Sequence, residues 1–297
     1  MHRITRILRL LLPAALLAGG LSAALPTSAG AATADGIKTY TGTFHDGATY
    51  LIQVPAKWNG TLFLFSHGYV VPGTSNPAAD APDSTTGGWM LSHGYALAGS
   101  SYAQTGWAVA SALPDQIHTL NVFDSTVGSP TQTIAWGQSL GGMITAGLIQ
   151  RYPHRFTAAA PMCGVLSGAV ATWNTALDAE FAFQQLIDPS VSVVNITDPG
   201  ANLISAETAA AKAQKYARGR ARLALVSALG DTPGWFTPLS PEPSATDYTA
   251  QEQNQYEWGS EVTFPFAFDL RAQLESLAGG NPSWNTGVNY FKDLLRP

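Results

Sequence analysis

Residues 131–142 read Thr131-Gln132-Thr133-Ile134-Ala135-Trp136-Gly137-Gln138-Ser139-Leu140-Gly141-Gly142. The first six residues are a short apolar run of the kind buried in parallel sheets, and residues 140–152 are typical of a helix. The five residues at the junction, 137–141, fit the pattern G-x-S-x-G, in which a serine occupies a sharp, strained strand-to-helix turn. The two glycines leave space where side chains would collide with the neighbouring strand and helix. The stretch therefore predicts an exposed, nucleophilic Ser139 at a helix N-terminus; the other interpretation is a turn packed with small residues.

Strand and helix signals alternate through the first half of the chain. This order favours an α/β fold with a mostly parallel sheet covered on both faces. After residue 164 the strand signals stop, and an Ala-rich, aromatic-containing helical cap is expected. The expected divisions are 1–31, 32–164 and 165–297. The expected strands are 38–44, 48–54, 61–65, 95–101, 131–136 and 156–162, and the expected helices are 86–93, 114–125, 140–152, 165–188, 205–229 and 249–277.

A second motif, His67-Gly68-Tyr69, follows the apolar run at residues 61–66. In α/β hydrolases, which these two motifs resemble, a His-Gly pair after this strand begins the loop that donates one backbone N–H to an oxyanion, and the amide after the nucleophile, here Leu140, is the other donor. Tyr69 is the expected first donor, and Gly68 lets the backbone approach a substrate closely. His67 is expected to shape this loop by hydrogen bonding; acting as a base is the alternative. Gly137, Gln138 and Gly141 are expected to shape the serine turn.

These motifs resemble the α/β-hydrolase superfamily, and more closely secreted bacterial serine hydrolases with a helical lid, distantly of the feruloyl-esterase and tannase type. The matching segments lie between residues 40 and 164; besides the serine turn they are 58–60, 94–98, 101–102 and 161–164. The resemblance implies an eight-stranded sheet, a lid inserted after the sixth strand, and a catalytic triad in the order Ser, Asp or Glu, His. In such relatives a disulfide ties the nucleophile region to the histidine loop.

The histidines depart from that pattern. They are at positions 2, 45, 67, 93, 118 and 154, and none follows His154. The triad acid and histidine, and the last two strands, are therefore expected to lie outside this sequence. An isolated chain without them is expected to be a poor catalyst, because serine without a base is a weak nucleophile at neutral pH. It is also expected to leave residues 156–162 as an exposed, aggregation-prone sheet edge.

The N-terminal 31 residues are typical of a secretory signal. A basic start with three arginines precedes an apolar stretch, and the small residues Ala29 and Ala31 suit a signal peptidase. Secretion is expected, with no stable membrane anchor, because the apolar stretch is short and interrupted by proline and glycines. The net charge of −5 makes nucleic acid a poor partner. A single cysteine, Cys163, excludes a disulfide within the chain and a cysteine-based zinc site, and no metal or cofactor motif is present.

The expected activity is hydrolysis of a small carboxylic ester by acyl transfer to Ser139, with a serine peptidase or a catalytically silent exported binding protein as alternatives. The cap aromatics are expected to form an apolar wall over Ser139, although over half of them are expected simply to pack the cap onto the sheet. Cys163 is expected to be an unpaired thiol, as a disulfide half or as a small buried residue. The cap aromatics are Trp173, Phe181, Phe183, Trp235, Phe236, Trp258, Phe264, Phe266 and Phe268.

Overall fold

The computed structural model describes residues 36–237 and 240–283. The proposed signal sequence therefore lies outside the described residues, as does the C-terminal end of the expected cap. The chain divides into two compact units at Leu166/Ser167, and each is described by itself. No helix in the described ranges is long and apolar enough to cross a membrane.

The first unit is built on a six-stranded sheet. The strands are β1 (Ile37–Thr43), β2 (Thr49–Pro55), β3 (Thr61–Ser66), β4 (Ala96–Ser100), β5 (Gln132–Gln138) and β6 (Ala158–Met162). Their order is β1-β2-β4-β3-β5-β6. The first two strands form an antiparallel hairpin, while β4, β3, β5 and β6 are mutually parallel. The predicted mostly parallel α/β fold is confirmed, and the described residues contain six strands, against the eight that the resemblance implies.

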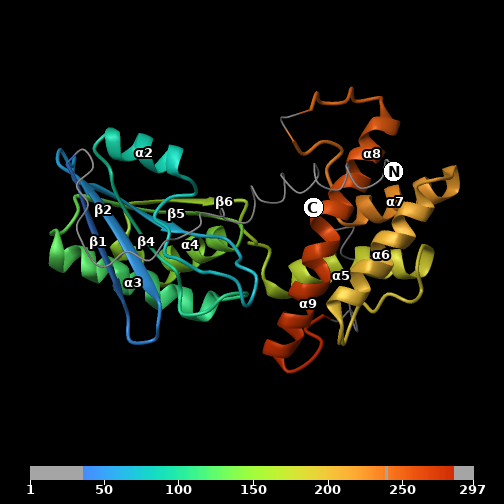
Figure 1. Cartoon of the computed structure of the whole chain (residues 1–297), viewed down its shortest axis with the longest axis horizontal. Helices are drawn as coiled ribbons and strands as arrows, with labels where there is room; N and C mark the ends of the chain where they lie inside the picture. Colours follow the sequence, from blue (N-terminus) through green and yellow to red (C-terminus); the bar gives the residue numbers. More distant parts are fainter. Residues whose placement is uncertain (1–35, 238–239, 284–297) are drawn as a thin grey trace, which may run out of the picture. The chain divides into compact units, whose positions relative to one another are not determined.

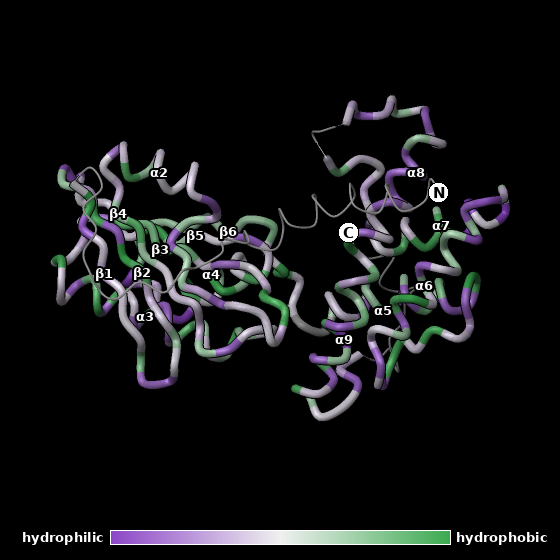
Figure 2. Tube along the Cα trace, viewed as in Figure 1, coloured by the Kyte–Doolittle hydropathy of each residue, from purple (hydrophilic) through white to green (hydrophobic). Residues whose placement is uncertain are grey.

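Helices cover both faces of this sheet. Helix α2 (Ser84–Ser92) lies on one face, and α3 (Val109–Thr126) and α4 (Leu140–Arg151) lie on the other (Figure 1). The face under α2 is packed with Phe65, Met90 and Trp136. The opposite face buries side chains of β2, β3, α3 and α4 in a larger apolar cluster. The inner strands are accordingly hydrophobic along most of their length (Figure 2).

Helix α3 begins five residues before the predicted start at Pro114. Proline inside a helix removes one backbone donor, so the sequence favoured a start at this residue. In the structure Pro114 is the sixth residue of α3, and buried Ala112 and Leu113 begin the packed face of the helix before it. The free energy gained by burying Ala112 and Leu113 outweighs the backbone hydrogen bond that Pro114 cannot donate.

The second unit is helical, as expected, but it has more helices than predicted. Its helices are α5 (Ala169–Leu186), α6 (Pro199–Ala213), α7 (Ala217–Leu229), α8 (Tyr248–Trp258) and α9 (Phe264–Ala278), with a π-helical turn at Gly259–Thr263 between the last two. The prediction of one helix over 205–229 is wrong, because the chain turns a corner after α6. Gly219 makes this corner possible, since a methyl group there would overlap the carbonyl of Ala213. The helix predicted over 249–277 is confirmed as one continuous helical run, because α8 passes through the π-helical turn into α9 without leaving right-handed helical backbone angles.

A buried charged cluster lies inside the second unit. Arg271 is 1% exposed and contacts Glu275 at 3.3 Å, and it also donates to the Ser283 hydroxyl at 2.8 Å. Glu180 belongs to the same electrostatic neighbourhood, where burial raises the pKa of its carboxyl to about 8, against the opposing effect of Arg271. Folding therefore favours the protonated form of Glu180.

Glu180→Gln is expected to stabilise the second unit at high pH. The pKa of Glu180 is higher in the folded state than the usual 4.5, so stability falls as pH rises from about 4.5 to about 8. Glutamine cannot ionise, so the variant should be more stable than the parent by about 1 kcal/mol or more at pH 9 and nearly equal to it at pH 4.5. Urea unfolding at the two pH values measures this. The control is Glu242→Gln, at an exposed position, and an equal response in both variants would contradict the prediction.

Candidate active site

Ser139 occupies the strained turn predicted for it. It is the residue between β5 and α4, and its φ of 57° and ψ of −123° are rare for a residue with a side chain. Its backbone N–H donates to the carbonyl of Met162 at 3.0 Å, which ties the turn to the end of β6. The residue is exposed, and no described residue hydrogen-bonds its hydroxyl. The strain thus holds Oγ above the C-terminal edge of the sheet.

The glycines around Ser139 are required by close backbone packing. A methyl group on Gly137 or Gly141 would overlap the carbonyl of Ser66 at the end of β3. On Gly142 a methyl group would lie 2.6 Å from the Met162 oxygen. The turn is therefore wedged between the ends of β3 and β6, which is the reason the pattern needs glycine here. The alternative of a simple turn with small residues does not account for the strained Ser139.

The predicted oxyanion loop lies next to Ser139. Strands β3 and β5 pair so that Ser66 is opposite Gly137, and the chain continues directly into His67 and Gly68. A methyl group on Gly68 would lie 3.7 Å from Ser139 Cβ, so the loop passes the serine at van der Waals distance. Leu140 is the first residue of α4, where backbone N–H groups have no acceptor within the helix. The helix N-terminus and the loop thus converge on the exposed serine hydroxyl.

His67 has both ring nitrogens directed at backbone oxygens. Nδ1 lies 2.8 Å from the Gly68 oxygen, and Nε2 lies 3.1 Å from the Ser101 oxygen. Burial lowers the pKa of the imidazole, although these two contacts oppose the shift. A base for Ser139 would need a free nitrogen lone pair facing the serine, and neither nitrogen of His67 provides it. The geometry thus favours the loop-shaping role over the role of a base.

Residues that the sequence analysis gave no role hold His67 in place. Tyr102 stacks on the imidazole with ring centres 3.9 Å apart, and its hydroxyl donates to the His67 oxygen at 3.0 Å. Tyr102 has a φ of 63° and is 2% exposed. At the end of β3, the buried amide of Gln116 donates to the Phe65 oxygen at 2.6 Å and to the Ser66 hydroxyl at 2.8 Å. A glutamine among the apolar residues of a helix is a sequence signal for a buried hydrogen-bonding role. The positive φ of Tyr102 has no such signal in the sequence.

A buried carboxyl group, Asp115, supports the loop that follows β4. Asp115 of α3 accepts a hydrogen bond from the Ala103 N–H at 2.9 Å, just after Tyr102. Burial, with the nearby Asp46 carboxylate, raises the pKa of Asp115 to about 7. The hydrogen bond from Ala103 to Asp115 therefore holds the loop after β4 against α3.

Three further described histidines lie on helices and turns of the first unit, and Cys163 directly follows the strand whose last carbonyl accepts from Ser139. His93 ends α2 and stacks on Trp89, His118 lies in α3 against Phe44, and His154 lies in the 3-10 turn after α4. Cys163 is an exposed free thiol with a φ of 48°, directly after β6. Its alternative role as a small buried residue is wrong, because Cys163 is exposed.

Several cap aromatics pack inside the second unit: Phe183 and Phe268 are each 2% exposed in its core. These two side chains pack within the helical unit itself, and the expected packing of the cap aromatics onto the sheet stays a prediction. The apolar wall over Ser139 stays a prediction. Among the described residues, no group of three or more His, Cys, Asp or Glu side chains could hold a metal ion.

The strand order, the serine turn and its glycine contacts define the first unit as an α/β-hydrolase fold. No family model matches the chain. A curated relative, o-phthalyl amidase from Xanthobacter agilis, is 26% identical in a 277-residue alignment that covers 84% of this chain and 59% of the relative. The chain thus spans less than two thirds of the length of that relative.

Similar solved structures include two esterases. Brefeldin A esterase, described as a bacterial homologue of human hormone-sensitive lipase, is 15% identical with a TM-score of 0.36, over 62% of this chain and 54% of that chain. Acetyl xylan esterase from Aspergillus awamori is 18% identical with a TM-score of 0.35, over 47% of this chain and 60% of that chain.

Proposed function

We propose that the chain carries the nucleophile of an exported serine hydrolase that cleaves a small carboxylic ester or amide. The observation that carries this proposal is the exposed Ser139, held at a φ of 57° on the N-terminus of α4 beside the Gly68 backbone. A purely binding protein has no need for a strained serine in this position. The leader-like residues 1–31 support export.

The proposed first step is attack of Ser139 Oγ on the substrate carbonyl. The serine proton passes to a base, a C–O bond to the enzyme forms, and the carbonyl oxygen becomes an oxyanion. In this proposal the backbone N–H groups of Leu140 and Tyr69 stabilise that charge, aided by the dipole of α4. The leaving alcohol or amine takes a proton as its bond to carbon breaks, and water then releases the acid from the acyl-serine.

The proton acceptor is not assigned to a described residue. His67 faces two backbone oxygens, and the remaining described histidines lie on the covering helices, their ends or the β-hairpin turn. Acyl transfer by this chain alone is therefore expected to be slow. This observation also favours the second candidate function, a catalytically silent exported protein that binds small molecules on the same fold.

The relation to an amidase leaves both ester and amide bonds open as substrates. The sequence prediction preferred esters over peptides, and the relative's name supports an amide as an equal candidate. A p-nitrophenyl ester and a p-nitroanilide that share one acyl group separate the two. We expect faster release from the ester, because p-nitrophenolate is the better leaving group, with an acyl adduct on Ser139 detected by mass spectrometry.

Ser139→Ala and His67→Ala are the informative variants in this assay. Ser139→Ala is expected to lose the acyl adduct, and His67→Ala is expected to keep a slow reaction with an unchanged pH profile. Robust turnover that vanishes in both folded variants would instead make His67 the base. Equal background rates without any adduct in the parent and both variants would support the silent binding protein.

A further inference from the structure

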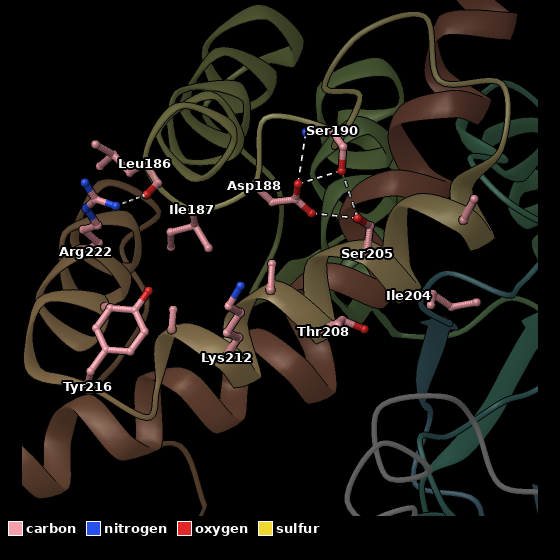
Figure 3. Close-up of a pocket in the computed structure, with 14 residues that line it drawn as sticks. Leu186, Ile187, Asp188, Ser190, Ile204, Ser205, Thr208, Lys212, Tyr216 and Arg222 are labelled. Atoms are coloured by element: carbon pink, nitrogen blue, oxygen red, sulfur yellow. Dashed lines mark hydrogen bonds between the residues drawn. The ribbon is translucent and has the colours of Figure 1, made fainter.

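A second candidate binding site lies wholly within the second unit. It is a pocket of about 650 Å³ between the end of α5, the loop after it, α6 and the start of α7 (Figure 3). This volume is within the range of about 300–1,000 Å³ found for small-molecule sites. Leu186, Ile187 and Ile204 supply apolar walls, and Tyr216 lies at one end. The pocket is lined only by residues of the second unit, whereas Ser139 belongs to the first unit.

Two basic side chains line this pocket. Lys212 projects from the last turn of α6, and Arg222 comes from α7. Neither makes an ion pair with a carboxylate among the described residues. They belong to the segment 212–222, which holds five basic residues and no acidic one in a chain of net charge −5. The position of this segment on a pocket is a reason to expect an anionic ligand.

The polar groups of the pocket are held in place before any ligand arrives. Arg222 Nη1 donates to the Leu186 carbonyl at 2.7 Å, which fixes the guanidinium and leaves its other N–H groups for a ligand. Asp188 accepts hydrogen bonds from the Ser190 hydroxyl and the Ser205 hydroxyl, each at 2.6 Å. These hydrogen bonds lower the pKa of the Asp188 carboxyl, although partial burial opposes the shift. Asp188 is thus ionised at neutral pH and already bonded within the protein.

The balance of charge selects the kind of anion. Two cations, Lys212 and Arg222, and one carboxylate, Asp188, leave the lining with one net positive charge. A singly charged ligand neutralises this net charge. A dianion such as phosphate would bring one negative charge more than the lining neutralises, and the Asp188 carboxylate would repel it. The apolar walls suit a hydrocarbon body beside the charge. We propose that this pocket binds a small organic monocarboxylate with an aromatic or aliphatic body, its carboxylate on Lys212 and Arg222.

Benzoate is a suitable probe, with benzyl alcohol as the uncharged partner of similar shape and inorganic phosphate as the multiply charged one. Calorimetric titration of the full chain is expected to give a dissociation constant for benzoate of about 1 mM or tighter. Benzyl alcohol and phosphate are expected to bind at least about tenfold more weakly, because charge-assisted hydrogen bonds and apolar contact act together only on benzoate.

Lys212→Met tests the location of the site, and Lys215→Met is its matched control, because Lys215 is basic, three residues away and outside the pocket lining. Lys212→Met is expected to weaken benzoate binding about tenfold, while Lys215→Met and Ser139→Ala leave it unchanged. Circular dichroism verifies that each variant is folded. Absence of benzoate binding to the folded parent, equal binding of phosphate, or equal losses in the two lysine variants would overturn the proposal. Ser139→Ala removes the proposed nucleophile but leaves this pocket intact. Loss of reactivity at Ser139 therefore tests the hydrolase proposal, and benzoate binding tests the present one.

Discussion

A fluorophosphonate probe is expected to form a covalent adduct with Ser139, and added imidazole is expected to speed its formation by about tenfold or more. The phosphorus centre resembles a substrate carbonyl under attack, so the strained serine and the nearby backbone amides favour reaction at this residue. Imidazole from solution supplies the base that no described histidine provides. Intact-mass and peptide analysis of the full chain measures both the site and the rate.

Ser139→Ala should abolish the adduct with and without imidazole. Ser125→Ala is the matched control, since Ser125 is an exposed serine near the end of α3 whose hydroxyl bonds only within its own helix. It should react like the parent. An adduct on another serine, labelling that survives Ser139→Ala, or an unreactive Ser139 at high imidazole would each contradict the assignment of the nucleophile.

The parts of the fold that depend on local patterning were predictable from the sequence. The apolar run before Gly137 and the helix after Ser139 predicted the strained turn, and the His-Gly motif after residue 66 predicted the neighbouring loop. These predictions succeeded because strand pairing brings the ends of β3 and β5 to one edge of the sheet, where the two motifs meet.

Features that depend on tertiary contacts were not predicted. The left-handed backbone of Tyr102 is held by its burial and its bonds to the His67 loop, and no local pattern encodes it. The start of α6 is different, because Asp198-Pro199 is a recognisable helix start: Asp198 caps the helix by accepting from the Ala201 N–H at 2.9 Å. The Ala-rich helix predicted over 205–229 began after this start signal and ran past the end of α6 at Ala213.

The network around His67 explains how one edge of the sheet supports both the loop and the serine. Tyr102 holds the His67 carbonyl and ring, Gln116 holds the end of β3, and the Ser66 carbonyl in turn fills the space beside Gly137 and Gly141. The His67–Gly68 loop and the serine turn therefore share one contact surface. A change at that surface is expected to disturb fold and reactivity together.

Gly141→Ala is expected to destabilise the first unit by about 3 kcal/mol or more. The added methyl group would overlap the Ser66 carbonyl and lie 2.7 Å from the His67 oxygen. Both obstacles are backbone atoms of β3 and the loop that follows it, so relief requires α4 to move away from the sheet. Urea unfolding followed by tryptophan fluorescence measures the loss, because Trp136 lies in β5 within the core.

Gly88→Ala is the matched control, since Gly88 is an exposed residue in α2 and a methyl group there meets nothing within 4 Å. Alanine loses less backbone entropy on folding than glycine, so this variant should be equally stable or more stable by up to about 1 kcal/mol. If Gly141→Ala instead unfolds at the same urea concentration as the parent, the close contact between α4 and β3 does not exist. The placement of Ser139 against the His67–Gly68 loop would then be wrong as well, because the same backbone approach positions both.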